Sequence, residues 1–188
     1  MHDDVGRLDH PLVEKWQVTS RGPEQDFHIF RAQWRRTRSP RTGEEHDVIV
    51  LSPPNWVNVV AVTPDEQVVL IHQYRHGVQQ VLLEVPGGML DADESPIRAG
   101  ARELLEETGY AGDEPVLIGT VHPNPAFLSN ICSSVLIRNV RKVANPQLDD
   151  GEDIEVTLAP IAEVPALIRS GRITHALVIV AFYHAGVC

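Results

Sequence analysis

Residues 88–110 read GMLDADESPIRAGARELLEETGY, and they are the most informative part of this 188-residue chain. After a glycine and an acidic loop, apolar side chains recur at helical spacing. Ser95 suits an N-cap, Pro96 the first helical position, and Gly109 the residue that stops the helix. These signals predict a helix from about Ser95 to Thr108.

Acidic and apolar side chains lie on different sides of this expected helix. On an ideal helix, Glu103, Glu106 and Glu107 share an arc of about 100°. An apolar stripe takes another side and consists of Ile97, Ala101, Leu104 and Leu105. We expect the stripe to dock the helix on a sheet and the three carboxylates to form a concentrated acidic cluster.

The acidic cluster has two interpretations. A solvated surface is the usual meaning of a charge run on a helix. Like charges one turn apart, however, destabilise a helix by roughly 0.2–0.5 kcal/mol per pair, and the only base on this side is Arg102, which can orient Glu106. Carboxylate oxygens concentrated in this way suit a hard divalent cation. The Gly87-Gly88 pair upstream supports the second interpretation, because glycine lets a ligand approach the main chain.

As a pattern, residues 88–110 resemble the Nudix box, GX5EX7REUXEEXGU, where U is a bulky apolar residue. Only Tyr110 is an imperfect match, because it stands at the last position, where the pattern has a bulky apolar residue. The resemblance implies a Nudix hydrolase, which cleaves the diphosphate bridge of a nucleoside diphosphate linked to another group. The matching positions are Gly88, Glu94, Arg102, Glu103, Leu104, Glu106, Glu107 and Gly109.

The resemblance also implies roles for the box residues. The metal would be Mg²⁺, with Mn²⁺ as a substitute, bound by Glu103, Glu106, Glu107 and the backbone carbonyl of Gly87. Glu106 and Glu107 would take part in catalysis through that metal. The structural positions of the box are Gly88, Glu94, Arg102 and Gly109, with Glu94 and Arg102 holding loop and helix in register.

Outside the box, the chain resembles the ADP-ribose pyrophosphatase branch of the family. The markers are VVLIHQYRHG at 68–77, LLEVPGG at 82–88, and Pro125. Arg75 matches a phosphate-contacting arginine of the branch, although a surface arginine at a strand end is the alternative. Met89 and Trp56 are candidate substrate contacts, and simple packing is the alternative for both. Pro125 is the remaining substrate-binding candidate.

A later acidic loop, DDGEDIE at 149–155, resembles the segment that supplies a further metal ligand or general base in that branch. Glu152 is the first candidate for this catalytic and metal-binding role, and Asp150 the second. A polar turn before a strand is the alternative interpretation of the loop.

Several departures from the branch leave the substrate open. Asn130 stands where the branch often carries a glutamate, and paired arginines of some members are replaced by Val48-Ile49-Val50. The expected reaction is Mg²⁺-dependent hydrolysis of ADP-ribose or a related nucleoside diphosphate sugar to a nucleoside monophosphate and a sugar phosphate. The alternatives are a GDP-mannose or broad nucleotide-sugar hydrolase, and a non-catalytic Nudix-fold nucleotide-binding module.

Charge and composition limit the partners and the compartment. The net charge of −10 disfavours nucleic acid and anionic membranes as partners. The opening MHDDVGRLDH lacks the apolar core of a signal peptide, and the apolar stretch 176–185 is shorter than the ~20 residues of a bilayer span. Two cysteines, Cys132 and Cys188, cannot form a disulfide framework. We therefore expect a cytoplasmic protein.

The order of elements predicts an α+β fold, an α/β/α sandwich with a mixed sheet between helices. Two further helices are expected at 162–169 and 174–184. The expected strands are at 57–63, 67–73, 81–85, 115–121, 133–137 and 154–158.

Residues 1–50 should form an N-terminal antiparallel β extension, with 34–47 as a long hairpin turn, ahead of a Nudix domain at 51–188. Its few apolar residues, among them Trp16, Phe27, Phe30 and Trp34, make a poor core, so a homodimer through this extension is expected.

Overall fold

A computed structural model of the chain describes residues 13–188, so the first twelve residues of the predicted extension lie outside the described part. The described chain divides into two compact units. The first comprises 13–53 together with 124–129, and the second comprises 54–123 and 130–188. The predicted boundary at residue 50 did not anticipate that 124–129 belongs with the N-terminal strands.

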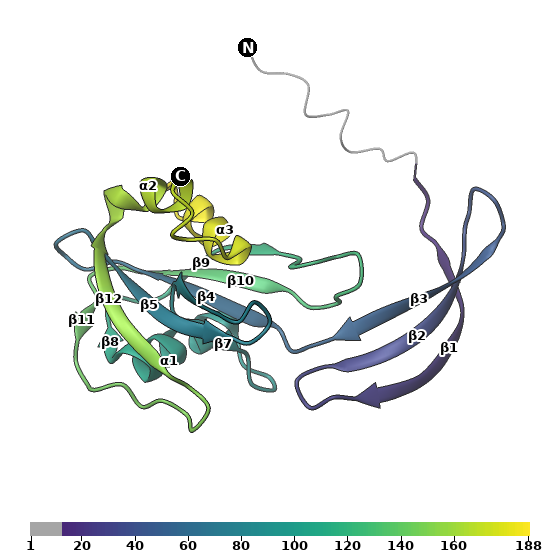
Figure 1. Cartoon of the computed structure of the whole chain (residues 1–188), viewed down its shortest axis with the longest axis horizontal. Helices are drawn as coiled ribbons and strands as arrows, with labels where there is room; N and C mark the ends of the chain where they lie inside the picture. The colour runs from purple at the N-terminus through teal and green to yellow at the C-terminus, as the bar shows by residue number, and fades with distance from the viewer. Residues whose placement is uncertain (1–12) are drawn as a thin grey trace, which may run out of the picture. The chain divides into compact units, whose positions relative to one another are not determined.

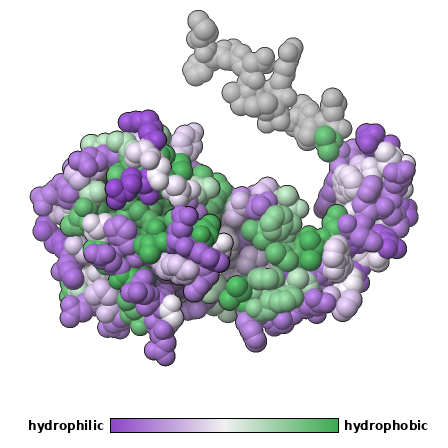
Figure 2. All heavy atoms as spheres, in the orientation of Figure 1, coloured by the Kyte–Doolittle hydropathy of each residue, from purple (hydrophilic) through white to green (hydrophobic). Residues whose placement is uncertain are grey.

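The first unit is a three-stranded antiparallel sheet in the order β1-β2-β3 (Figure 1). Its strands are β1 Gln17–Asp26, β2 Arg31–Arg38 and β3 Glu45–Ser52. Only Ala32, Thr37 and Ser39 are buried among the described residues of this unit. Figure 2 shows both hydrophilic and hydrophobic areas on the surface of this unit.

The expected long turn at 34–47 was wrong, because most of that stretch is strand. Arg36 pairs with Asp47 at 2.9 Å and Arg38 with Glu45 at 2.8 Å across β2 and β3. Opposite charges facing each other in this way favour strand pairing over an open polar loop. The turn itself is short, closed by hydrogen bonds between the backbones of Ser39 and Glu44 and of Gly43 and Ser39. The strand-like residues Phe27 and Ile29 instead lie in the turn between β1 and β2.

The second unit contains the remaining elements, which Figure 1 shows with α1 on one side of the strands and α2 and α3 on the other. Its helices are α1 Pro96–Thr108, α2 Val164–Arg169 (preceded by a 3₁₀ turn, Ile161–Glu163) and α3 Ala176–His184. Its strands are β4 Trp56–Ala61, β5 Gln67–Arg75, β6 Gln80–Glu84, β7 Gly87–Met89, β8 Tyr110–Ala111, β9 Val116–Val121, β10 Cys132–Ile137, β11 Arg141–Lys142 and β12 Ile154–Pro160.

Two main sheets organise this unit, in the orders β7-β4-β10-β9 and β12-β5-β6, with a small β11-β8 ladder beside them. The β4–β10 pairing is parallel and the others are antiparallel. The predicted α+β fold with a mixed sheet between helices and an antiparallel N-terminal extension is therefore confirmed.

The core of the second unit has two parts, because β4 is apolar on both faces. Val60 and Val62 pack with Phe182 of α3 and its neighbours. Val57 and Val59 pack with Leu104 of α1. Continuous Val and Ile runs of this kind are typical of strands that are covered on both sides. This packing fixes α1 against β4 and β7, which carry the glycine pair.

Helix α1 buries a different stripe from the one expected. Ala101 and Leu105 are exposed, whereas Glu103 and Glu107 are buried together with Leu104. The small residues Ala99 and Gly100 let the helix approach the sheet closely, and Glu103 and Glu107 follow at helical spacing on the same face. The acidic cluster is thus turned largely into the protein. None of the helices formed by residues 13–188 combines the length and apolar character needed to cross a bilayer.

Candidate active site

The ends of α1 are formed by its own sequence. The Ser95 side chain accepts a hydrogen bond from the Arg98 N–H at 3.3 Å, and Pro96 occupies the first turn. Gly109 ends the helix in the left-handed conformation, with φ of 74°. A side chain at Gly109 would also collide with the carbonyl of Ala144. These features place α1 directly after the β7 turn.

Arg102 connects the loop to the helix. Its Nε and Nη2 donate to the two carboxylate oxygens of Glu94 at 3.1 and 2.8 Å, and Nη2 also donates to the Met89 carbonyl at 3.2 Å. Its Nη1 donates to Glu103 at 2.9 Å and to Glu106 at 3.0 Å. One guanidinium therefore holds the loop and two of the three box carboxylates of α1.

Glu107 is the most deeply buried of these carboxylates, with 2% of its surface exposed. Its Oε2 accepts a hydrogen bond from the Gly87 N–H at 2.8 Å. Burial raises the pKa of Glu107 to about 8 although the Gly87 bond lowers it, and the charges of Glu103 and Glu152 raise it further. Burial also raises the pKa of Glu103 despite the opposing charge of Arg102. Burial thus opposes the ionised form of both side chains more strongly than nearby arginines favour it.

Gly88 lies directly against this acidic pair. A Cβ atom at Gly88 would collide with the carboxylate of Glu103. Glycine is thus required here for close approach between the loop and the helix. The result is a narrow space in which a backbone turn and buried carboxylates meet.

The groups around the turn fit a hard divalent cation, because they are carboxylate and carbonyl oxygens. In residues 13–188 no three acidic, histidine or cysteine side chains are already gathered around one point in ligand geometry. The carboxylates have other partners instead. Arg102 donates hydrogen bonds to Glu103 and Glu106, and the Gly87 N–H donates to Glu107.

Arg75, the predicted phosphate contact, lies at the end of β5 and is engaged by a glutamate that the sequence analysis did not single out. Its Nε and Nη2 donate to the two oxygens of Glu84 at 2.9 and 3.0 Å. Glu84 Oε2 also lies 2.6 Å from Nδ1 of His175. Burial by itself raises the pKa of Glu84, but the bonds from His175 and Arg75 outweigh it and lower that pKa to about 2.

Part of the Arg75 guanidinium is free. Nη1 of Arg75 makes no hydrogen bond within the described chain. The charges of Glu107 and Glu152 help to raise the pKa of Arg75, after the opposing effect of burial and the larger effect of Glu84. Arg75 is thus held by Glu84 and is also influenced by the charges of Glu107 and Glu152.

Glu152 lies in a tight turn of the acidic loop. Its N–H donates to the Asp149 carbonyl at 2.9 Å, and its carboxylate accepts from the Asp149 N–H at 3.1 Å. The charge of Glu152 contributes to the raised pKa values of Glu103 and Glu107. Asp150 is not among the largest causes of either shift. Of the two acidic candidates in this loop, Glu152 therefore has the stronger influence on Glu103 and Glu107.

The other substrate-binding candidates fall into two groups. Trp56 and Met89 are paired directly across β4 and β7, and Met89 is exposed, so these two side chains border the box loop. Pro125 belongs to the segment 124–129 of the first unit and is exposed there.

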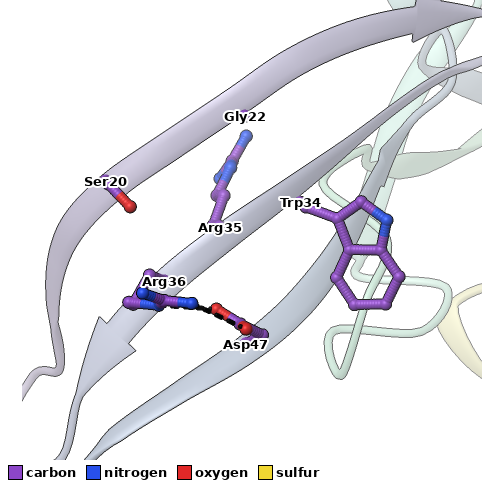
Figure 3. A pocket seen from close by; sticks show the side chains of 6 residues that line it. All are labelled: Ser20, Gly22, Trp34, Arg35, Arg36 and Asp47. Atoms are coloured by element: carbon purple, nitrogen blue, oxygen red, sulfur yellow. Dashed lines mark hydrogen bonds and ion pairs between the residues drawn. The ribbon is translucent and has the colours of Figure 1, made fainter.

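The first unit carries its own shallow hollow, of about 540 Å³ (Figure 3). Its lining consists of Ser20, Gly22, Trp34, Arg35, Arg36 and Asp47. The Arg36–Asp47 pair is drawn as a dashed contact, and Trp34 stands farther along β2. Trp34 faces Ile49 across the sheet, and both side chains are exposed. This surface combines an indole with arginine side chains.

The chain is similar to known proteins in sequence and in fold. An ADP-ribose pyrophosphatase of Bacillus subtilis is 27% identical over 125 residues, which cover 66% of this chain and 68% of that protein. A methanol dehydrogenase activator of Bacillus methanolicus is 27% identical over 133 residues, covering 70% and 72%. The crystal structure of an ADP compounds hydrolase matches 94% of this chain and 95% of its own with a TM-score of 0.81 and 18% identity, which shows a shared fold.

The family model for the NUDIX domain matches residues 52–179. That range contains the glycine pair, the Arg102-centred loop and helix, the buried carboxylates, Arg75 and the Glu152 turn. With most of its length matched and its box geometry formed as described, the chain belongs to the Nudix family and is a Nudix hydrolase.

Proposed function

We propose that this Nudix hydrolase cleaves the diphosphate bond of ADP-ribose or a related nucleoside diphosphate sugar, using Mg²⁺ or, as a substitute, Mn²⁺. The products would be a nucleoside monophosphate and a sugar phosphate. The observation that carries the proposal is the buried pair Glu103 and Glu107, which lies directly against the Gly87-Gly88 turn. Anionic groups this deeply buried require a cation when they are ionised.

In this proposal Glu103, Glu106, Glu107, Glu152 and the Gly87 carbonyl hold the metal. A bound divalent ion supplies charge neutralisation at the diphosphate and an acidified water. Arg102 keeps Glu103 and Glu106 beside the loop through its two Nη1 hydrogen bonds. Glu106 and Glu107 thereby serve catalysis by fixing the ion.

The groups outside the box act on the substrate. Arg75 offers the unbonded edge of its guanidinium to a phosphate oxygen, a contact that suits the planar fork of arginine. Glu152 accepts a proton from the attacking water, with Asp150 as the second candidate. Trp56 and Met89 border the channel in which the sugar and phosphates lie.

The choice of ADP-ribose is supported by the Bacillus subtilis relative, which is named for that substrate. Asn130 is held inside the unit, where its Nδ2 donates to the Pro54 carbonyl at 2.9 Å, and the chain lacks the glutamate often found near that position. This departure favours testing GDP-mannose and other nucleotide sugars beside ADP-ribose.

The test is a substrate panel of ADP-ribose, GDP-mannose, NADH and 8-oxo-dGTP, each with Mg²⁺, with products identified by mass spectrometry. We expect a nucleoside monophosphate and a sugar phosphate from ADP-ribose. GDP-mannose turnover at equal or higher kcat/KM would assign the broader specificity. Release of inorganic diphosphate from 8-oxo-dGTP, without cleavage of either nucleotide sugar, would overturn the proposal.

We also propose that residues 1–50 form a dimerisation extension ahead of a Nudix domain at 51–188, and that the enzyme is a homodimer. The support is the exposure of large apolar side chains on a three-stranded sheet that has almost no core of its own. Trp34 is 57% and Ile29 64% exposed, and Trp16 and Phe27 are exposed as well. A second copy is the commonest cover for such a surface in a soluble protein.

Light scattering of the full chain tests this assembly. We expect twice the 20.8 kDa chain mass at micromolar concentration, and a return towards the chain mass in a variant with Trp34→Ser and Ile49→Ser. An Arg41→Ser variant, at the exposed hairpin tip, is the matched control and should leave the mass unchanged. A wild-type chain that is monomeric and fully active at nanomolar concentration would contradict the proposal.

A further inference from the structure

A buried ion-pair network outside the Nudix box links β5, β6 and the start of α3. Glu84, the last residue of β6, is 2% exposed. Both of its oxygens are used: Oε1 accepts from Arg75 Nε at 2.9 Å, and Oε2 accepts from Arg75 Nη2 at 3.0 Å and lies 2.6 Å from His175 Nδ1. A buried carboxylate with three directed contacts is a rigid anchor, because each remaining orientation would leave it without a partner.

Register explains why Arg75 reaches this anchor. β5 and β6 pair Ile71 with Glu84 and Arg75 with Gln80, so Arg75 and Glu84 lie on the same face of the hairpin, several residues apart along it. Arg75 must therefore extend along the strands towards Glu84. Arginine is a long side chain with many rotamers, and two parallel hydrogen bonds to one carboxylate select a single orientation of its guanidinium.

His175 is the second partner of Glu84. It precedes α3, and its side chain does not cap that helix but contacts Glu84 instead. Its carbonyl accepts the N–H groups of Val178 and Ile179, and Val178 lies in the same core cluster as Leu83 and Val85, which flank Glu84. The contact thus connects the orientation of Glu84 to the position of a packed helix.

We propose that Glu84 and His175 are positioning residues for Arg75. They fix its guanidinium through Nε and Nη2, so that Nη1, which has no hydrogen bond within the described chain, is free to donate to a substrate diphosphate. The inference rests on the proposed function, because it takes a diphosphate as the group that Arg75 meets. Glu84 itself does not touch the substrate.

A double-mutant cycle tests the coupling. Glu84→Gln removes the charge but keeps the shape, and we expect it to raise KM for ADP-ribose about tenfold, with kcat changed much less, since an ion-pair contact to phosphate acts in the bound state as well as in the transition state. In an Arg75→Lys background, which cannot form the fork, the same substitution should add less than about a twofold effect. His175→Ala should raise KM less than Glu84→Gln, because the Arg75 fork is retained.

Glu163→Gln, at an exposed glutamate before α2, is the matched control and should leave KM unchanged. Equal losses from Glu84→Gln in the wild-type and Arg75→Lys backgrounds would overturn the inference, because Glu84 would then act independently of Arg75. Thermal unfolding of each variant separates loss of folded protein from loss of binding. If Glu84→Gln does not fold, His175→Ala decides the question with the same cycle.

An NMR readout separates this inference from the proposed function. The Arg75 Nε–H signal should be protected from exchange in the wild type, shift when ADP-ribose is added with Ca²⁺, and lose both properties in Glu84→Gln. A wild-type enzyme that cleaves no nucleotide sugar would refute the proposed function. An Arg75 signal that stays protected and responds to ADP-ribose equally in Glu84→Gln would refute the positioning role.

Discussion

Replacing Glu107 by Gln should damage activity and stabilise the metal-free protein at the same time. The change keeps the side-chain volume and an oxygen that can accept the Gly87 N–H. It removes the negative charge of a side chain that is only 2% exposed. The ordinary pKa of 4.5 is raised by burial to about 8. Because the folded-state pKa is the higher one, ionisation of Glu107 opposes folding. The contribution of Glu107 to the free energy of unfolding is fully present below pH 4.5 and is lost as the pH rises through 8.

The pKa shift of Glu107 sets the size of the expected change in stability. At pH 7 the shift spans about 2.5 pH units, which corresponds to about 3 kcal/mol of lost stability relative to acidic solution. For a chain of this size such a difference moves Tm by roughly 5–10 °C. Activity should fall about 100-fold or more, because a ligand charge for the ion is lost.

The assay is thermal unfolding in EDTA at several pH values between about 4 and 8, with activity measured separately in Mg²⁺. We expect Glu107→Gln to melt above the wild type at pH 7–8 and to match it near pH 4. Glu106→Gln is the control on the same helix: its carboxylate is partly exposed and bonded to Arg102, so its loss should lower activity without raising metal-free Tm. A Glu107→Gln protein that melts below the wild type in EDTA at pH 8 would refute the reasoning.

Three further outcomes are expected. EDTA should abolish turnover and Mg²⁺ or Mn²⁺ restore it, with Tm rising on metal addition; full activity in metal-free buffer would argue against the proposed mechanism. Gly88→Ala should weaken Mg²⁺ binding measured by calorimetry, because the added Cβ displaces the Glu103 carboxylate, whereas Gly109→Ala should mainly lower Tm through its positive φ and the Ala144 carbonyl. The hydrogen bonds from His175 and Arg75 outweigh burial and lower the pKa of Glu84 from 4.5 to about 2, so Glu84 should contribute about 3 kcal/mol of stability above pH 4.5. That contribution is lost as the pH falls through 2, so urea unfolding of the wild type and Glu84→Gln should converge in acid.

Local signals were enough to predict the box helix and the general order of elements. Ser95, Pro96 and Gly109 act within a few residues of themselves, so the helix ends where its sequence indicates. The burial of its faces could not be assigned in the same way. A helical wheel sorts side chains by polarity, which favoured Leu105 for the core and Glu107 for the surface. The fold places Glu107 inside, because the chain approaches α1 through the Gly87-Gly88 turn on that face.

The features that could not be predicted depend on contacts between residues far apart in the sequence. Cross-strand charge pairs such as Arg36–Asp47 convert a polar stretch into a hairpin, and the sequence alone does not identify which charges will face each other. Glu84 and His175 are 91 residues apart, and only the packing of α3 brings them together. LLEVPGG was noted as a family marker, but nothing local in that motif indicates that its glutamate holds Arg75.

Two buried glutamates of the second unit differ in the partners that the chain gives them. Glu84 and Glu107 are both 2% exposed, so both lose the solvation of their charge. Glu84 is met by Arg75 and His175, and its pKa is lowered to about 2. Glu107 makes no ion pair within the described chain, receives only the Gly87 N–H, and has its pKa raised by burial to about 8. Because the chain already supplies the Arg75 guanidinium to Glu84, a metal gains little there. Ionised Glu107 has no such partner within the described chain, and this contrast supports the proposal that the metal binds at Glu107.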